Sequence, residues 1–135
     1  MSRILVLGGT RFIGRKTVQL LKEREHSLTL VHRGQTNAEK IAGVQHLIGD
    51  RAALTAILPQ HNTYDAVLDC CALFPPHLQE MRRALSQRVG KIVQVGSISV
   101  YSRSGPEPVT EETPRWECSP EEAQDTSLAS YCQRK

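Results

Sequence analysis

Tyr131 and Lys135 are four residues apart and would share one face of a helix. An ammonium beside a phenol stabilises the phenolate, which lowers the pKa of a tyrosine from its ordinary value of about 10. Such a pair can exchange a proton with a substrate oxygen. Alone the pair is common by chance, and the alternative is an exposed helix carrying an ordinary Tyr and Lys.

A glycine-rich turn near the N-terminus predicts a phosphate-binding site. Ile4–Leu7 reads as a short buried strand. It is followed at once by the candidate cofactor-binding residues Gly8, Gly9, Thr10, Arg11, Phe12, Ile13 and Gly14. The glycines allow a tight turn and the close approach of a diphosphate, which the start of the next helix attracts. Because Arg11 stands where a middle glycine is expected, an ordinary strand–turn–helix is the alternative.

Apolar runs alternate with helical periodicity along the chain. Strands are predicted at 4–7, 28–31, 44–48, 66–70 and 92–95. Helices are predicted after the glycine turn, over 52–58, from Pro75 with apolar residues repeating up to Val89, and from near Thr126. Since right-handed crossovers return each strand to parallel pairing, the pattern predicts an α/β, Rossmann-type doubly wound parallel sheet of order 3-2-1-4-5.

Ligands of such sheets bind at the carboxyl ends of the strands, near the reversal of strand order. This predicts one crevice between the first and fourth strands, surrounded by the glycine turn, Cys71–Phe74 with Ala72, and Ser97. Residues 101–127 are rich in Ser, Pro, Glu and Thr and predict a long loop directed toward the substrate site. Within it, Ser119 is expected to cap a helical turn that begins at Pro120.

Composition excludes several classes of function. The 135 residues suit one domain, and a net charge of +3 without a basic run, with 4% aromatic residues, does not predict nucleic-acid binding. The N-terminal apolar run is too short for a membrane span and does not resemble a secretory signal, so a cytoplasmic protein is expected. Four cysteines and five histidines lack metal-ligand spacing, so no metal site is expected.

The glycine turn, Ser97 after the fifth strand and the Tyr-x-x-x-Lys pair together resemble the short-chain dehydrogenase/reductase superfamily. The resemblance is to its extended or atypical branch, the NAD(P)-dependent epimerases and dehydratases. Val95–Tyr101 resembles the Ser-x-x-Val-Tyr segment of that branch, and Val109–Pro114 resembles the acidic, proline-containing loop that follows it. The resemblance covers the whole chain.

The resemblance implies hydride transfer to or from nicotinamide with a small-molecule substrate, such as a nucleotide sugar. It implies that Ser97 bonds the reacting oxygen, that Tyr131 is the acid and base, and that Lys135 holds the nicotinamide ribose while tuning Tyr131. Ser99 competes for the role of Ser97, which is preferred because it lies four residues before Tyr101.

Two segments depart from the family pattern. Asp69-Cys70-Cys71-Ala72 stands where an Asn or Ala motif is frequent, and Arg134 precedes the lysine where Ser is usual. No upstream Asn can therefore be assigned to a proton relay.

The end of the second strand predicts a preference for NADP over NAD. No acid lies between Leu28 and Asn37, whereas Arg33 falls where a ribose-binding carboxylate is expected. A guanidinium suits the 2′-phosphate of NADP. The alternative is that Arg33 is merely solvated. Asp50 is expected either to approach the adenine or to cap the helix after it.

The family continues past the position of Lys135 into further strands and a substrate-binding region. We therefore expect these 135 residues to be the N-terminal, nucleotide-binding part, with little or no turnover. A homodimer through the uncovered apolar surface is expected, which light scattering would detect. Alternative functions are an RNA-binding module, as in plant stem-loop-binding relatives, and an NADP-sensing regulator. Retention of Ser97, Tyr131 and Lys135 argues against both.

Overall fold

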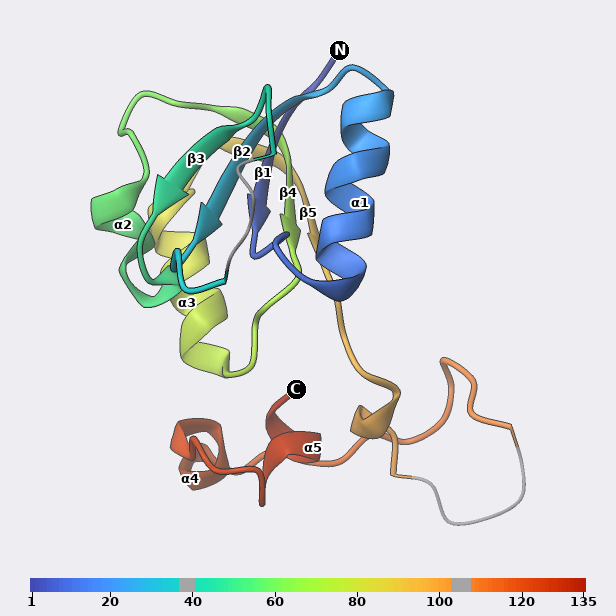
Figure 1. Ribbon diagram of the computed structural model, residues 1–135. Helices are drawn as coiled ribbons and strands as arrows, with labels where there is room; N and C mark the ends of the chain where they lie inside the picture. The colour runs from blue at the N-terminus through green and yellow to red at the C-terminus, as the bar shows by residue number, and fades with distance from the viewer. Residues whose placement is uncertain (37–40, 103–107) are drawn as a thin grey trace.

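The computed structural model describes residues 1–36, 41–102 and 108–135. Its centre is a five-stranded parallel sheet in the order β3-β2-β1-β4-β5, which confirms the predicted topology (Figure 1). The strands are β1 (Arg3–Leu7), β2 (Ser27–His32), β3 (Gln45–Ile48), β4 (Tyr64–Asp69) and β5 (Val89–Gln94). The first strand of the chain is therefore the central one.

Helices cover both faces of the sheet, with α1 (Phe12–Glu23) on one face (Figure 1). The other face carries the 3-10 turn η1 (Arg51–Ala53) and the helices α2 (Leu54–Ile57) and α3 (Pro75–Ala84). Alternate residues of β1 reach the two sides: Leu5 and Leu7 pack with the α2 and α3 side chains, and Ile4 and Val6 pack with those of α1. This alternation follows from the period of two along a strand.

The residues after β5 leave the sheet and fold below its carboxyl ends (Figure 1). They form the 3-10 turn η2 (Ile98–Val100) and the short helices α4 (Pro120–Gln124) and α5 (Tyr131–Arg134). Tyr101 makes an isolated antiparallel bridge with Arg115. Part of the predicted loop 101–127, residues 103–107, lies outside the described residues.

Two predicted helix boundaries are wrong. The helix expected to run to Val89 ends at Ala84, and the chain turns through Gln87, whose φ is +59°, so that Val89 begins β5. The helix expected from near Thr126 begins only at Tyr131, because the Asp125 carboxylate binds Ser127 and Ser130 and holds a turn there.

The predicted cap at Ser119 is confirmed. Its hydroxyl accepts the Glu122 N–H at 3.1 Å, and the Glu122 carboxylate accepts the Ser119 N–H at 2.8 Å. This reciprocal arrangement satisfies two backbone donors at the start of α4.

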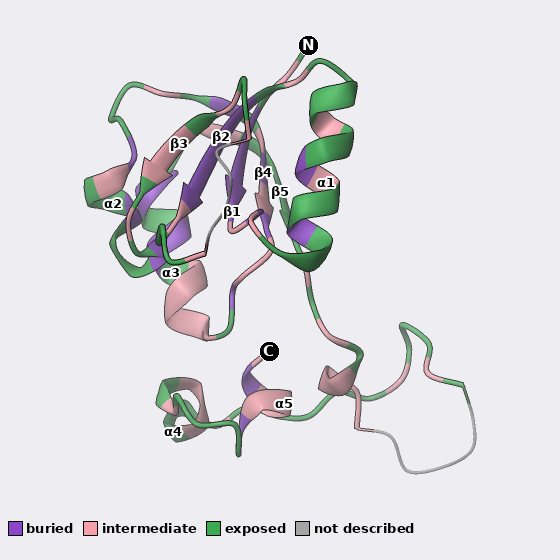
Figure 2. Cartoon of the chain, in the orientation of Figure 1, coloured by how far each residue is buried: buried purple, intermediate pink, exposed green. Residues whose placement is uncertain are grey.

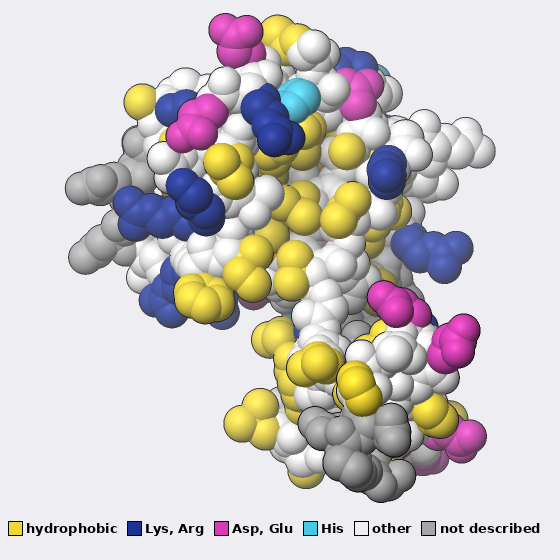
Figure 3. Space-filling model, turned by 90° about the vertical axis from the view of Figure 1, so that its right-hand side faces the viewer, with side chains coloured by type: hydrophobic (Ala, Val, Ile, Leu, Met, Phe, Trp, Pro, Cys, Tyr) yellow, Lys and Arg dark blue, Asp and Glu magenta, His cyan; other side chains and the backbone are white. Residues whose placement is uncertain are grey.

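Burial is concentrated in the central strands β1 and β2 (Figure 2). Strand β5 forms one edge of the sheet, and its Ile92 and Val93 are about half exposed. Hydrophobic side chains also gather on the face shown in Figure 3, which is the side of the molecule where α1 lies. None of the helices in the described segments combines the length and hydropathy that crossing a membrane requires.

Candidate nucleotide-binding and active site

A cleft of about 780 Å³ opens at the carboxyl ends of β1, β2 and β4. Of the predicted cofactor-binding residues, the turn from Gly8 to Gly14, Arg33 and Asp50 all line it. Ala72 does not, since it is buried between Cys71 and Leu73, which do line the cleft. The chain therefore folds its predicted phosphate-binding turn into the wall of a real cavity.

Backbone geometry explains the glycines of this turn. Gly8 and Gly9 have φ values of +91° and +83°, in the left-handed region. A Cβ atom on Gly14 would lie 2.8 Å from the Gly9 Cα atom, so the start of α1 can approach the turn this closely only without a side chain. Phe12, 89% exposed, also has a positive φ of +45°, which places backbone strain beside the cleft.

The end of β2 presents His32 and then Arg33 to the cleft, and only Arg33 carries a charge there. His32 Nδ1 accepts the Gly34 N–H at 3.1 Å, so its ring proton belongs on Nε2, which is 2.9 Å from His46 Nδ1. Burial, and then the neighbouring His46, lower the pKa of His32, so this ring is neutral near pH 7. The exposed guanidinium groups of Arg11 and Arg33 therefore supply the positive charge at this end of the cleft.

Asp50 has the capping role, one of its two predicted alternatives, while it also lines the cleft. Its Oδ1 atom accepts the Ala52 N–H at 2.8 Å at the start of η1. The next residue, Arg51, is thereby directed from η1 toward the base of the cleft.

A buried ion pair that the sequence analysis did not anticipate lies there. Arg51 donates to both carboxylate oxygens of Asp69, at 2.6 and 2.8 Å, and to the His77 carbonyl at 3.2 Å. Asp69, fully buried, also accepts the Cys71 N–H at 3.0 Å. Burial opposes the charge on Arg51, but the hydrogen bond and charge of Asp69 outweigh it and raise the pKa of the guanidinium. The pair anchors the turn after β4.

Ser97 and Lys135 line a second cavity of about 570 Å³, together with Glu111 from the long loop. Ser97 is thus placed beside the predicted crevice and does not line the cleft itself. Its Oγ atom is 2.7 Å from that of Ser99, so the two competing serines are hydrogen-bonded to each other. Lys135 Nζ donates to the Ala72 carbonyl, at the edge of the cleft.

Tyr131 begins α5, one helical turn before Lys135, and is partly buried. It lines neither of the two cavities. The structure therefore brings Ser97 and Lys135 to one cavity and leaves Tyr131 on the adjoining helix.

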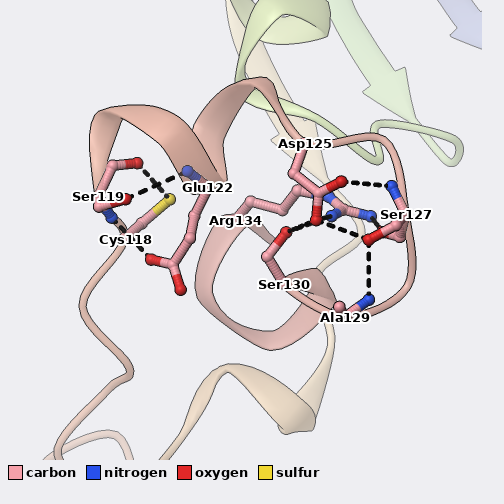
Figure 4. Close-up of polar contacts among 8 residues, drawn as sticks. All are labelled: Cys118, Ser119, Glu122, Asp125, Ser127, Ala129, Ser130 and Arg134. Atoms are coloured by element: carbon pink, nitrogen blue, oxygen red, sulfur yellow. Dashed lines mark hydrogen bonds and ion pairs between the residues drawn. The ribbon is translucent and has the colours of Figure 1, made fainter.

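A polar network organises the segment that carries Tyr131 and Lys135 (Figure 4). The Asp125 carboxylate accepts the Ser127 N–H at 2.8 Å, the Ser127 hydroxyl at 2.7 Å and the Ser130 hydroxyl at 2.5 Å. Arg134 donates to the Ser130 hydroxyl at 2.6 Å and pairs with Asp125 at 3.6 Å. Hydrogen bonds from Ser127 and Ser130 hold the pKa of Asp125 far below its ordinary value.

This network predicts a specific acid dependence. The pKa of Asp125 in the folded protein lies below its ordinary value of 3.8. The carboxylate therefore contributes fully to the free energy of unfolding above pH 3.8, and this contribution is lost only as the pH falls through the pKa of the folded state. We expect the carboxyl carbon shift of Asp125, followed by NMR from pH 7 to pH 2, to stay constant down to about pH 4. A midpoint at or above 3.8 would contradict the network.

A protein-family comparison decides the assignment. Residues 4–127 match the model of the NAD dependent epimerase/dehydratase family. The chain belongs to this family. The predicted family resemblance is therefore confirmed, although no curated protein sequence matches the chain significantly.

Solved structures show that this epimerase/dehydratase chain shares its fold with larger enzymes. It is similar to a UDP-glucose 4-epimerase, with a TM-score of 0.70 and 21% identity over 84% of this chain and 41% of that one. A UDP-N-acetylglucosamine 4-epimerase from Bacillus cereus has a TM-score of 0.67 and 22% identity over 85% of this chain and 44% of that one. The Bordetella bronchiseptica enzyme WbmG, in complex with NAD and UDP, has a TM-score of 0.67 and 14% identity over 84% of this chain and 43% of that one. The chain spans less than half the length of these structures.

Proposed function

We propose that this chain is the nucleotide-binding part of an NAD(P)-dependent oxidoreductase of the epimerase/dehydratase type. The observation that carries the proposal is the glycine turn lining a cleft beside β1 and β4, where the strand order reverses. The turn and the start of α1 would hold the diphosphate, and Arg33 would face the adenosine ribose. The close Gly9–Gly14 approach fits this use, since side chains there would fill the cradle.

We further propose that Ser97, Tyr131 and Lys135 form the proton-transfer site. A bound nicotinamide would supply the hydride donor or acceptor. Ser97 would hold the substrate oxygen, Tyr131 would give or take its proton, and Lys135 would bind the nicotinamide ribose. Support comes from the shared cavity of Ser97 and Lys135 and from the Lys135 contact with Ala72 at the edge of the cleft.

The proposed substrate is a nucleotide sugar, held in the cavity beside the nucleotide. Four residues of the long loop line that cavity, which supports the expected direction of the loop; they are Tyr101, Val109, Thr110 and Glu111. The two named epimerases and the UDP bound to WbmG support this class of substrate. The cytoplasmic location and the homodimer stay predictions.

The cofactor preference is tested by titrating the chain with NADPH and NADH. We expect NADPH to bind more tightly, because Arg33 and Arg11 are exposed and line the cleft. Among the described residues that line the cleft the one acid is Asp50, whose carboxylate caps η1. Arg33→Ala should weaken NADPH binding by about 10-fold to 100-fold, the worth of one charge-assisted hydrogen bond, and leave NADH binding nearly unchanged. Nucleotide fluorescence provides the measurement.

Arg24→Ala is the matched control, since Arg24 is an exposed arginine at the far end of α1 and does not line the cleft. It should bind both nucleotides as the unmodified chain does. Tighter binding of NADH would reverse the NADP preference, and a chain that binds neither nucleotide would refute the proposed function.

A further inference from the structure

We propose that Arg134 is a positioning residue that docks α5 against the wall of the nucleotide cleft and so places Lys135 beside the nicotinamide half of the nucleotide. This inference rests on the proposed function of Lys135. It assigns a role to one of the residues at which the chain departs from its family pattern.

The guanidinium of Arg134 is held within the protein. Its side chain is 1% exposed, and it donates to the Ser130 hydroxyl and to the Ser127 carbonyl while pairing with Asp125. These hydrogen bonds and the charge of Asp125 offset the cost of burying the cation, while its Nε–H has no hydrogen-bond partner among the described residues. The side chain is therefore a fixed part of the α4–α5 segment.

The same guanidinium lies over an aromatic ring of the sheet domain. Its Cζ atom is 4.9 Å from the centroid of the Phe74 ring, within the range of a cation–π contact. Phe74 directly precedes α3 and lines the nucleotide cleft. The ring also contacts His77, at 4.9 Å between centroids, and the His77 carbonyl accepts a hydrogen bond from Arg51. Arg134 thus contacts Phe74, and Phe74 is linked through His77 to the buried Arg51–Asp69 pair.

Lys135 contacts the same turn from the next position in the chain. Its amine donates to the Ala72 carbonyl, two residues before Phe74. Arg134, the last residue of α5, and Lys135 directly after it therefore meet the turn after β4 at two points. The contact of Arg134 with Phe74 fixes the end of α5 and with it the position of the Lys135 amine. A serine at position 134 could neither reach the ring nor supply the charge.

Binding of two nucleotides to the same variant tests this role. ADP carries the adenosine and diphosphate but no nicotinamide ribose, whereas NADPH carries both halves. Arg134→Met keeps much of the side-chain length and removes the charge and donors. We expect it to weaken NADPH binding by about tenfold, equivalent to about 1.4 kcal/mol, and to leave ADP binding unchanged. Equal loss for both nucleotides, or no loss for NADPH, would overturn the inference.

A double-mutant cycle separates positioning from general destabilisation. If Arg134 acts through Lys135, then Arg134→Met should cause little further loss of NADPH affinity in a Lys135→Met background. Full additivity would contradict the inference. Arg134→Lys keeps a cation near Phe74 and should bind NADPH more tightly than Arg134→Met does. Equal NADPH affinity of these two variants would also contradict the inference. Failure of the unmodified chain to bind either NADPH or NADH would instead overturn the proposed function.

Discussion

Gly14→Ala should abolish most nucleotide binding and lower the free energy of unfolding by about 1–3 kcal/mol, the usual range for overpacking a tight contact. The added Cβ atom would lie 2.8 Å from Gly9 Cα and 2.9 Å from Gly9 N. Both are backbone atoms, so the phosphate-binding turn itself must move. We expect NADPH affinity to fall by about 100-fold, equivalent to about 2.7 kcal/mol. Nucleotide titration and urea unfolding measure the two effects.

Gly96→Ala is the control for this prediction. A Cβ atom on Gly96 meets nothing within 4 Å, and this residue lines the second cavity and not the nucleotide cleft. Its stability and NADPH affinity should stay close to those of the unmodified chain. If Gly14→Ala behaved in the same way, the close approach of α1 to the turn would be incorrect.

Arg51→Met should lower the free energy of unfolding by about 3–5 kcal/mol, the cost of removing one member of a buried ion pair. The Asp69 carboxylate is fully buried and would lose both guanidinium hydrogen bonds, keeping only the bond from the Cys71 N–H. Urea denaturation provides the measurement. Because Asp69 anchors the turn after β4, nucleotide binding should weaken as well.

Two comparisons make this prediction specific. Arg82→Met removes an exposed arginine of α3 and should change stability by less than about 0.5 kcal/mol. In an Asp69→Asn background, Arg51→Met should cost clearly less than it does alone, because the carboxylate charge that Arg51 neutralises is gone. A single-variant loss below about 1 kcal/mol would show that the pair is not buried as described.

Much of the fold could be predicted because it depends on local patterns. Each strand contains apolar residues in succession or alternation, and right-handed crossovers leave few possible strand orders. The glycine turn could also be predicted, since Gly8 and Gly9 have positive φ values that glycine adopts easily. Helix ends were less readable: Val89 continues the helical period, yet it pairs with Tyr64 as a strand residue because the positive φ at Gln87 redirects the chain.

The buried Arg51–Asp69 pair joins residues from two different elements, η1 and β4, and the periodicity of the sequence cannot predict such a contact. Asp69 at the end of a buried strand did carry a signal, because a carboxylate there requires a partner. Nothing local indicated that Arg51, from another crossover, would provide it. In the sequence, Arg134 stands out only as a departure from the family pattern. Its burial depends on the turn at Asp125, which folds around the guanidinium.

The sheet order also has a consequence for biosynthesis. As the chain emerges from the ribosome, β1 appears first and can pair with β2 early, but its other side stays open until β4 has been made. During that interval an apolar strand presents unpaired backbone groups, a state prone to association with other nascent chains. Closure of the nucleotide cleft therefore has to wait for the second half of the polypeptide.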